Sequence, residues 1–308
     1  MSRKMVVTGG AGFIGHHLVR ALCDRGDEVH VIDRDLSFRR TLLDSRAKLN
    51  ECDIRDREKL APIMTGADSV FHLAAAAVVQ DSIDRPVETT DDNVLGACAV
   101  FDAAVKAKVR RIVNVSSSAV YGDQKEEIMR EDISARPMSP YGLQKLMIEE
   151  MAQAWHVIYG IETVSLRYFN VYGTGLDPRG AYARVMAIFL RQRLENEPLT
   201  ITGDGTQTRD FVHVNDVVRA TLQASETSDV GGGEVINIGS GVATSVNDIA
   251  QNIGGEVRHV ESRFEQHDTR ADVSRAKELL GWQPEMNLVD GMEELTRSFG
   301  LTRESKLS

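Results

Sequence analysis

Three glycines, spaced three positions apart, lie where the first predicted strand turns into the first predicted helix. Gly9, Gly12 and Gly15 separate an apolar run at 4–8 from residues 13–25, whose apolar side chains recur at helical spacing. Glycine in such a turn lets the backbone come close to a pyrophosphate, and the amino end of the helix supplies N–H donors and a positive dipole. Because strand, turn and helix occur in the required order, the motif predicts a dinucleotide-binding unit rather than a chance turn.

A carboxylate follows the second predicted strand, at 28–32. Asp33 stands where it can accept hydrogen bonds from the ribose hydroxyls of an adenosine, and it would repel a 2′-phosphate. This favours NAD over NADP, although Arg34, the next residue, weakens the preference. Asp53 follows a third short strand. Two interpretations of Asp53 are open: it contacts the adenine amino group, or it is the N-cap of a helix over 55–60.

The chain alternates short apolar runs with helical patterns, which predicts a parallel sheet built from βαβ units. We expect an α/β protein with a doubly wound Rossmann sheet, helices on both faces, and a smaller mixed α/β C-terminal domain for the substrate. The NAD-binding domain is expected over 1–170, with a return strand near 212–240, and the discontinuous substrate domain over 171–308. Further strands are expected at 69–73, 111–116, 162–167 and 235–238, and further helices at 93–107, 141–159, 182–196, 215–224, 246–253 and 274–280.

The composition argues against several classes of function. The chain has 308 residues and a net charge of −10, which argues against general binding to nucleic acid or anionic membranes. No stretch approaches the roughly 18 apolar residues of a membrane span, and the first residues lack a signal-peptide pattern. The three cysteines have no paired spacing, which predicts neither a disulfide framework nor a metal site. We expect free thiols and a cytoplasmic location.

Hydroxyl and amine side chains in the middle of the chain indicate acid–base chemistry. Tyr141 and Lys145 lie four positions apart at the start of a predicted helix, so they share a face. The ammonium would stabilise a phenolate and lower the tyrosine pKa from about 10, although such a pair alone is more often a surface contact. Ser116, Ser117 and Ser118 lie at the carboxyl end of the fifth predicted strand, and ligands of open parallel sheets bind beyond the carboxyl ends of the strands. A serine there could relay a proton between Tyr141 and a substrate hydroxyl.

Together these motifs resemble those of the extended short-chain dehydrogenases/reductases, in particular the NAD-dependent nucleotide-sugar epimerase/dehydratase family. The similarity extends to segments 167–173, 203–211 and 279–282, and so covers nearly the whole chain. Within the family, the motifs are most similar to those of UDP-glucose (UDP-galactose) 4-epimerases and their N-acetylhexosamine relatives. The resemblance implies an NAD-dependent isomerase that inverts C4 of a UDP-hexose.

The resemblance also implies a role for each residue. Tyr141 would remove the proton of the sugar 4-hydroxyl while C4 gives hydride to NAD, and the 4-keto sugar would rotate before hydride returns to its other face. Lys145 would lower the Tyr141 pKa and hold the nicotinamide ribose. Ser117 would be the catalytic hydroxyl, with Ser118 as the alternative, and NAD would stay bound because each turnover regenerates it. Cofactor contacts are implied for Gly9, Gly12, Phe13, Ile14, Gly15, Asp33, Asp53, Ile54, Leu73, Ala74, Ala75, Asn93, Ser116, Tyr141, Lys145 and Tyr168, and substrate contacts for Ser117, Ser118, Asn170, Arg209, Arg263 and Thr269.

Other activities on the same scaffold are less well supported. Ser118 and Ala119 stand where 4,6-dehydratases carry an Asp-Glu pair, and UDP-glucuronate decarboxylases usually have an acid near the position of Ala119. Alanine cannot transfer a proton, so both activities rank below epimerisation. A 4-ketoreductase and a non-catalytic NAD-binding regulatory protein are further alternatives, and the complete set of Tyr141, Lys145 and Ser117 argues against the latter.

Two more expectations concern the sugar and the assembly. Thr269 corresponds to a position that lines the pocket near C2 of the sugar in relatives, and its small side chain leaves room for an N-acetyl group. UDP-GlcNAc and UDP-GalNAc are therefore hypothesised as additional substrates. The resemblance also implies a homodimer, in which helices 93–107 and 141–159 of each subunit form a four-helix interface.

Overall fold

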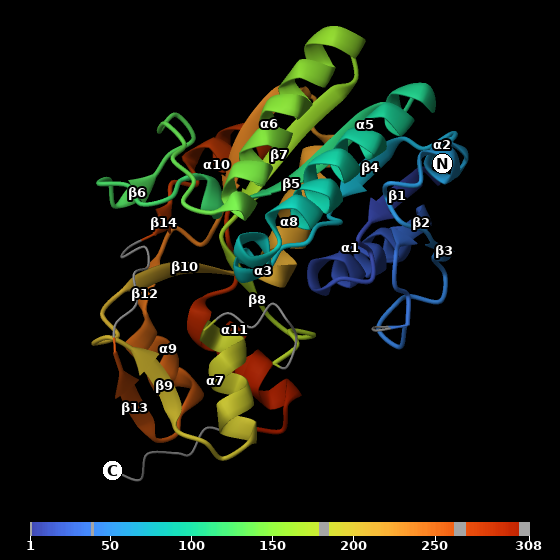
Figure 1. Ribbon diagram of the computed structural model, residues 1–308. Coiled ribbons are helices and arrows are strands. Elements are labelled where there is room, and N and C mark those ends of the chain that lie inside the picture. Colours follow the sequence, from blue (N-terminus) through green and yellow to red (C-terminus); the bar gives the residue numbers. More distant parts are fainter. Residues whose placement is uncertain (1, 38–39, 179–184, 262–268, 302–308) are drawn as a thin grey trace.

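A seven-stranded parallel sheet forms the centre of the molecule (Figure 1). The computed structural model describes residues 2–37, 40–178, 185–261 and 269–301. The chain runs outward from β1 to β3 and then, from β4, outward in the opposite direction, and such a reversal marks the ligand-binding crevice of a doubly wound sheet. In order across the sheet, the strands are β11 (Gly232–Ile238), β7 (Glu162–Tyr168), β5 (Arg111–Ser117), β4 (Ser69–His72), β1 (Lys4–Thr8), β2 (Glu28–Asp33) and β3 (Lys48–Glu51).

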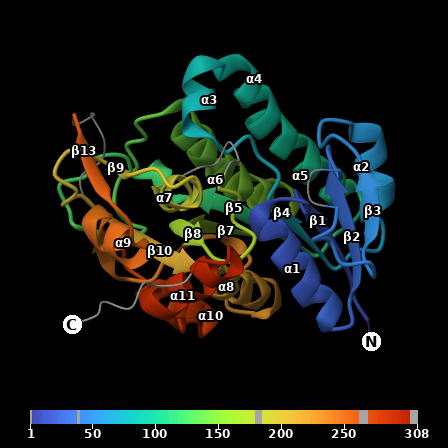
Figure 2. The same ribbon diagram turned by 90° about the horizontal axis from the view of Figure 1, so that it is seen from below.

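Helices cover both faces of this sheet. Successive side chains of each strand point to opposite sides, so each face carries apolar side chains that a layer of helices buries. Met5 and Val7 belong to the core of one face, and Val6 to the core of the other. Figure 2 shows α1 and α8 on one side of the strands and α5 and α6 on the other. The predicted Rossmann fold is thus confirmed. The first face is covered by α1 (Phe13–Asp24), α8 (Val214–Glu226) and α10 (Ser274–Leu280), and the second by α2 (Arg57–Met64), α5 (Gly96–Lys106) and α6 (Pro140–Tyr159).

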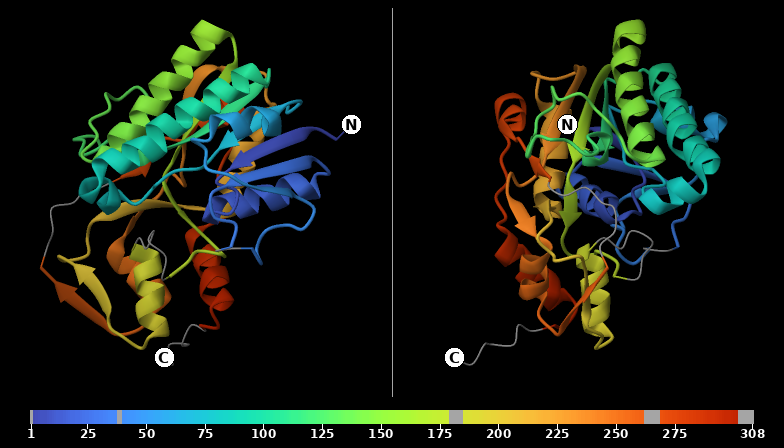
Figure 3. Two further views of the ribbon diagram at one scale, coloured as in Figure 1. Left: turned by 45° about the vertical axis from the view of Figure 1, so that its right-hand side comes forward. Right: turned by 60° about the vertical axis from the view of Figure 1, so that its left-hand side comes forward.

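A smaller mixed α/β part has its own core, to which Tyr172, Phe189, Ile201, Phe211 and Leu295 belong. In both views of Figure 3, its yellow and orange segments lie apart from the large sheet. Its strands β12 (Ala243–Ser245), β10 (Thr208–His213) and β8 (Asn170–Tyr172) form one sheet, and β13 (Val257–Val260) pairs with β9 (Leu199–Thr202). Its helices are α7 (Val185–Leu194), α9 (Val246–Ile253) and α11 (Leu288–Ser298).

Short elements occupy the connections. They are α3 (Val79–Asp84), α4 (Pro86–Thr90), a π-helical turn η1 (Asp91–Leu95), a 3₁₀ turn η2 (Ser118–Val120), and the paired strands β6 (Ile128–Met129) and β14 (Arg270–Ala271). Among the described helices, none combines the length and the apolar character needed to cross a membrane.

Several predicted boundaries differ from the observed ones near the carboxyl ends of the strands. The helix expected at 93–107 begins as the π-helical turn η1 and becomes α-helical only at Gly96, where a Cβ would lie 2.6 Å from Ile54 Cδ1. The helix expected at 182–196 is observed as α7, and residues 182–184 lie outside the described residues. α6 begins one residue earlier than predicted, because Ser139 Oγ accepts the Gly142 N–H at 3.1 Å and a proline suits the first helical position.

Gly15→Ala tests how closely α1 packs on the glycine turn. A Cβ at Gly15 would lie 2.2 Å from the Gly9 carbonyl oxygen and 2.8 Å from Gly10 Cα, whereas a Cβ at Gly12 would meet the Gly9 oxygen at 3.0 Å. Because backbone atoms cannot rotate away, we expect Gly15→Ala to lower the free energy of unfolding by about 2–3 kcal/mol. Gly12→Ala is the matched control and should cost clearly less. Urea denaturation measures both, and equal losses would contradict the packing described.

Candidate active site

The glycine turn lies where the strand order of the large sheet reverses. Gly9 has φ +70°, a left-handed conformation that favours glycine, and a Cβ there would lie 2.6 Å from the backbone nitrogen of Ala74. The turn after β1 therefore lies against the turn formed by Leu73, Ala74 and Ala75 after β4. Gly12 is the N-cap residue of α1 and has no side chain, so it leaves the N–H groups of the first turn to another acceptor. This cradle fits the pyrophosphate of a dinucleotide.

Asp33 lies at the end of β2, beside the glycine turn. Its carboxylate accepts the Ala11 N–H at 3.0 Å, which fixes the acid against the turn. Burial raises the pKa of the Asp33 carboxyl above its ordinary value, and hydrogen bonds from backbone N–H groups oppose this shift. Arg34 lies 3.0 Å from Asp92 in η1, so its charge is balanced by a neighbouring carboxylate. A fixed acid next to a paired arginine fits NAD.

Asp53 lies in the loop between β3 and α2. It accepts the backbone N–H of Arg55 at 2.8 Å and the Arg55 Nη2 at 2.7 Å. α2 begins at Arg57 with Asp56 as its N-cap residue. The interpretation of Asp53 as the N-cap of a helix over 55–60 is therefore wrong, because Asp53 closes a turn with Arg55 before the helix starts. Its contact with adenine stays a prediction.

Asn93 in η1 connects three segments around the cradle. Its Oδ1 accepts the Ala76 N–H at 2.7 Å, and its Nδ2 donates to the Ala76 carbonyl oxygen at 3.0 Å and to Gln144 Oε1 at 2.7 Å. The side chain thereby joins η1, the turn after β4 and α6. π-Helical turns such as η1 are frequent at functional sites. Cofactor contacts stay predictions for Phe13, Ile14, Ile54 and Asn93.

Tyr141 and Lys145 lie on the first turns of α6 and are both buried. Lys145 Nζ lies 5.9 Å from the centre of the Tyr141 ring and donates to the Val115 carbonyl oxygen at 2.8 Å. The Tyr141 N–H donates to Ser82 Oγ at 3.0 Å, which anchors the start of the helix. Burial lowers the pKa of Lys145 to about 8, and the Glu149 carboxylate opposes this shift. The amine is still mostly charged at neutral pH, so it can stabilise a tyrosinate.

The three serines at the end of β5 have different surroundings. Ser116 donates its O–H to Glu149 Oε1 on α6. Ser117 is the last residue of β5, and its Oγ accepts the Ala119 N–H at 3.2 Å as the N-cap of η2. Because Ser117 Oγ is the acceptor in that bond, its proton is available to another acceptor. Ser118 begins η2 and is half-buried.

Gly142 allows α6 to approach η2. A Cβ at Gly142 would lie 2.5 Å from the Ala119 carbonyl oxygen. A larger residue would therefore separate the start of α6, which carries Tyr141, from the turn that follows Ser117. This contact brings the predicted base and the predicted catalytic hydroxyl to the same edge of the sheet.

Two of the predicted substrate residues, Asn170 and Arg209, lie on strands of the smaller part. Asn170 on β8 donates from Nδ2 to the Asp210 carbonyl oxygen at 3.0 Å. Arg209 on β10 donates from Nη1 to the carbonyl oxygen of the preceding residue at 2.8 Å. Thr269 is 4% exposed, and within the described residues its Oγ1 has no hydrogen-bond partner. Arg263 lies outside the described residues.

Sequence reasoning missed Asp210, which ties the smaller part to the large sheet. Its carboxylate accepts the backbone N–H groups of Ser240, Gly241 and Ala271 at 2.6, 2.9 and 3.0 Å. Burial raises the pKa of the Asp210 carboxyl, while these bonds oppose the shift. The available signal was an acid directly before the apolar run that continues β10. Glu149 and Arg167 were also missed, although both belong to predicted elements.

Two other polar side chains near the site are turned into the core. Tyr168 Oη lies 2.6 Å from Thr221 Oγ1 on α8, and burial raises the pKa of Tyr168. Any cofactor contact of Tyr168 therefore competes with this bond if it uses the hydroxyl. His72 Nδ1 lies 2.9 Å from Thr8 Oγ1, and burial lowers the pKa of His72 to about 3, so the ring is neutral.

Known proteins are similar to this chain over almost its whole length. Residues 5–239 match the NAD-dependent epimerase/dehydratase family. A protein of Methanocaldococcus jannaschii with the provisional name UDP-glucose 4-epimerase is 38% identical over 300 residues, which cover 94% of this chain and 96% of that protein.

Two solved structures have the same fold. The UDP-glucose 4-epimerase of Thermotoga maritima, in complex with UDP-glucose, has a TM-score of 0.91 and 35% identity, over 96% of this chain and 98% of that one. The UDP-N-acetylglucosamine 4-epimerase of Methanobrevibacter ruminantium, in complex with UDP-N-acetylmuramic acid, has a TM-score of 0.91 and 31% identity, over 97% and 98%. The glycine cradle, the buried Tyr-Lys pair and these similarities lead to one conclusion: the chain belongs to the NAD-dependent epimerase/dehydratase family.

Proposed function

We propose that the protein inverts C4 of a UDP-hexose, with UDP-glucose and UDP-galactose as the substrate pair. The observation that carries this proposal is the buried pairing of Tyr141 with Lys145 on α6, next to the end of β5 where Ser117 lies. The glycine cradle beside it fits NAD. The similarity to UDP-sugar 4-epimerases supports the same activity.

Each residue of the site has one task in this reaction. Bound NAD supplies a hydride acceptor that is restored within each turnover. Tyr141 takes the proton of the sugar 4-hydroxyl and later returns it. Lys145, fixed by the Val115 carbonyl oxygen, stabilises the tyrosinate with its positive charge. Ser117 donates its available proton toward the substrate oxygen.

Two of the alternatives on this scaffold lack a group that they need. Both 4,6-dehydration and decarboxylation would require an acidic side chain near Ala119, whose methyl group transfers no proton. The backbone N–H of Ala119 is bound to Ser117 Oγ, so this residue shapes the turn. A 4-ketoreductase would consume reduced cofactor, which the NMR experiment below distinguishes from isomerisation.

The pyrophosphate of the UDP-sugar would be held by Asn170, Arg209 and Arg263, since guanidinium groups bind phosphate oxygens with two parallel hydrogen bonds. In this arrangement residues 1–170 bind NAD, and 171–308 mainly bind the sugar nucleotide, while β11 returns to the first sheet. A cytoplasmic location remains a prediction from three cysteines, Cys23, Cys52 and Cys98, which are free thiols in the structure.

A panel of nucleotide sugars tests the activity and its specificity. The purified protein is incubated with UDP-, dTDP-, GDP- and CDP-hexoses, and the products are read by NMR. We expect a C4-inverted product from UDP-glucose and UDP-galactose. Because Thr269 is small, we also expect turnover of UDP-GalNAc. Loss of water or net NADH consumption would contradict epimerisation, and no turnover of UDP-GalNAc would remove the N-acetyl proposal alone.

Tyr141→Phe tests the assigned base. The substitution removes the phenol oxygen and keeps the ring, so we expect kcat to fall by about 100-fold or more while NAD remains bound. Tyr159→Phe is the control, because this tyrosine lies on the same helix and is 54% exposed. Its kcat should equal that of the wild type. If Tyr141→Phe retained wild-type turnover, the mechanism would be wrong.

We further propose a homodimer that uses α5 with η1 and α6 of both subunits. The large apolar side chains that are exposed on these elements include Leu95 at 54%, Leu143 at 49% and Met147 at 46%. Leu143 and Met147 lie four positions apart and share a face of α6. Exposed apolar side chains that gather on one surface are typical of protein interfaces.

Met147→Glu tests this interface by introducing a charge into it. We expect the variant to elute as a monomer in size-exclusion chromatography with light scattering, because a buried unpaired carboxylate is costly. Val289→Glu on α11 is the matched control, since Val289 is 47% exposed. A monomeric wild type, or two variants with the same oligomeric state, would refute the proposed interface.

A further inference from the structure

Glu149 is a buried carboxylate on α6 to which the reaction proposed above gives no role. It is 1% exposed and lies four positions after Lys145, just as Lys145 lies four positions after Tyr141. The three side chains therefore follow one another along one face of the helix. A buried carboxylate is costly unless it is paired and hydrogen-bonded, so its partners indicate what it is held for.

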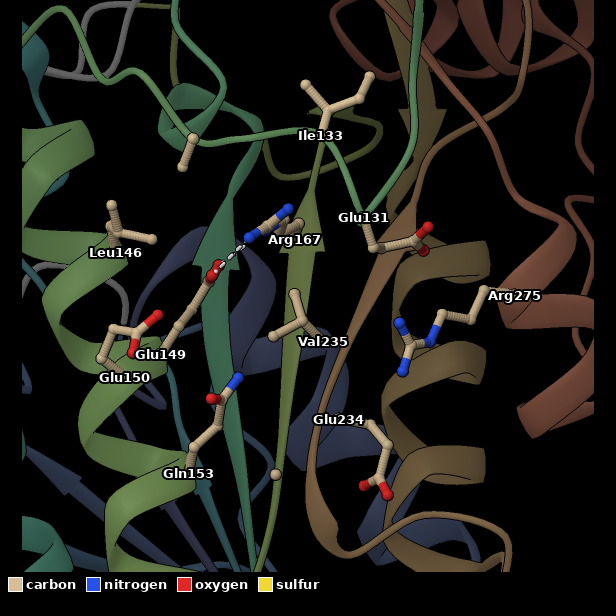
Figure 4. Close-up of a pocket in the computed structure, with 12 residues that line it drawn as sticks. Glu131, Ile133, Leu146, Glu149, Glu150, Gln153, Arg167, Glu234, Val235 and Arg275 are labelled. Carbon is tan, nitrogen blue, oxygen red and sulfur yellow. Dashed lines mark hydrogen bonds and ion pairs between the residues drawn. The ribbon is translucent and has the colours of Figure 1, made fainter.

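Glu149 contacts two neighbouring strands of the large sheet. Ser116 on β5 donates its O–H to Glu149 Oε1. Arg167 on β7 donates from Nε to Oε1 at 2.9 Å and from Nη2 to Oε2 at 2.7 Å, the contact drawn in Figure 4. The guanidinium of Arg167 also lies 4.7 Å from the centre of the Tyr121 ring. A two-point bond to arginine and a third bond to serine leave the carboxylate little freedom.

α6 thereby binds two successive residues at the end of β5. Lys145 donates to the Val115 carbonyl oxygen at 2.8 Å, and Glu149 accepts from the side chain of Ser116. The next residue along the strand is Ser117. These two adjacent bonds fix the position and the orientation of the strand end relative to α6. They therefore also fix it relative to Tyr141, which lies one turn before Lys145. Displacements of about 1 Å in such a geometry can lower rates about 100-fold.

The buried charged side chains between α6 and β7 include two cations and one anion. Lys145 and Arg167 are 3% and 5% exposed cations, and the anion Glu149 is paired with Arg167. The attraction of Glu149 opposes the effect of burial on Lys145, whose pKa is about 8. His72 on β4 adds no charge, because burial lowers its pKa to about 3. Removal of the anion would take away the carboxylate that is paired with Arg167 and the attraction that opposes the effect of burial on Lys145.

A pocket of about 300 Å³ lies at the Glu149–Arg167 pair (Figure 4). Tyr141, Lys145 and Ser117 do not line it. The pocket carries four carboxylates against two guanidinium groups, so it does not favour the anionic substrate. Besides the pair itself, the charged residues that line it are Glu131, Glu150, Glu234 and Arg275.

We propose that Glu149 is a positioning residue for the epimerisation: its carboxylate holds the Ser116–Ser117 end of β5, to which Lys145 is bonded at Val115, in place against Tyr141. This inference rests on the proposed function, because the reaction is its readout. Glu149 touches neither substrate nor cofactor in this arrangement and acts through Lys145 and Ser116.

Glu149→Gln tests the proposal, because it removes the charge and keeps the shape. Lys145 should then lose its proton at lower pH, because the effect of burial on its pKa is no longer opposed by the carboxylate. We expect the basic limb of the kcat–pH profile to move down by at least about one pH unit, with kcat about tenfold lower on that limb. KM for the UDP-sugar and the NAD content should remain close to those of the wild type. Glu149→Asp keeps the charge, so its basic limb should remain at the wild-type pH.

Two further variants separate this role from structural damage. Glu150→Gln is the matched control, because Glu150 is adjacent, exposed and lines the same pocket. Its profile should superimpose on that of the wild type. Arg167→Met removes the cation that is paired with Glu149, so the carboxylate attracts the Lys145 ammonium without competition. The basic limb of this variant's kcat–pH profile should lie at or above the wild-type pH, even if the variant is less stable.

Three results would overturn the proposal: superimposable Glu149→Gln and wild-type profiles, equal shifts for Glu149→Gln and Glu150→Gln, or a downward shift for Arg167→Met. A Glu149→Gln variant that does not fold leaves the Arg167→Met and Glu149→Asp profiles as the test. If the wild type does not epimerise any UDP-sugar, the proposed function itself fails, which is distinguishable from all of these results.

Discussion

The buried ammonium of Lys145 is the constraint on which the rest of the site depends. A charged group that is 3% exposed is destabilising unless its surroundings compensate for it. The Val115 carbonyl oxygen and the Glu149 carboxylate provide that compensation. Because the carbonyl belongs to the end of β5 and the lysine to the start of α6, the same contact fixes strand and helix relative to each other. The positions of Tyr141 and Ser117 follow from it.

The large sheet brings this pair next to the glycine turn. The strand order reverses between β1 and β4, and the turns that follow these two strands touch at Gly9 and Ala74. β5 is the next strand along, so the ends of three adjacent strands carry the cradle and Ser117, and α6 places Tyr141 at the same edge. The smaller part is tied to the same edge of the sheet through Asp210, which binds the turn after β11. Cofactor cradle, base and predicted substrate strands therefore share one rigid support.

The sequence was sufficient for those parts of the fold that depend on local patterns. The strands of the large sheet are short apolar runs, and the helices over it have clear periodicity, so element type and layer order could be predicted. The small sheets could not, because β9 pairs with β13 and β6 with β14 across long stretches of chain, and each strand is only a few residues long. No local sequence pattern predicts which of these distant strands pair.

The same distinction applies to the candidate site. Gly9, Asp33, Tyr141 and Lys145 could be proposed as site residues because turn chemistry and helical spacing are local properties. The two partners of Glu149 could not be predicted in this way, because they depend on the register between β5 and β7. That register places Ser116 beside Arg167. The pairing of Arg34 with Asp92 likewise joins segments that are distant in sequence. Long-range register thus decides which charges are balanced, and only the folded structure provides it.

The most direct test of the central claim follows the hydrogen at C4 of the sugar. UDP-galactose carrying deuterium at C4 is incubated with the protein, and the product is analysed by NMR. Reversible oxidation at C4, with Tyr141 handling only the hydroxyl proton, predicts UDP-glucose that retains deuterium at C4. Exchange of that deuterium with solvent, its transfer to another carbon, or a product that is not inverted at C4 would contradict the account.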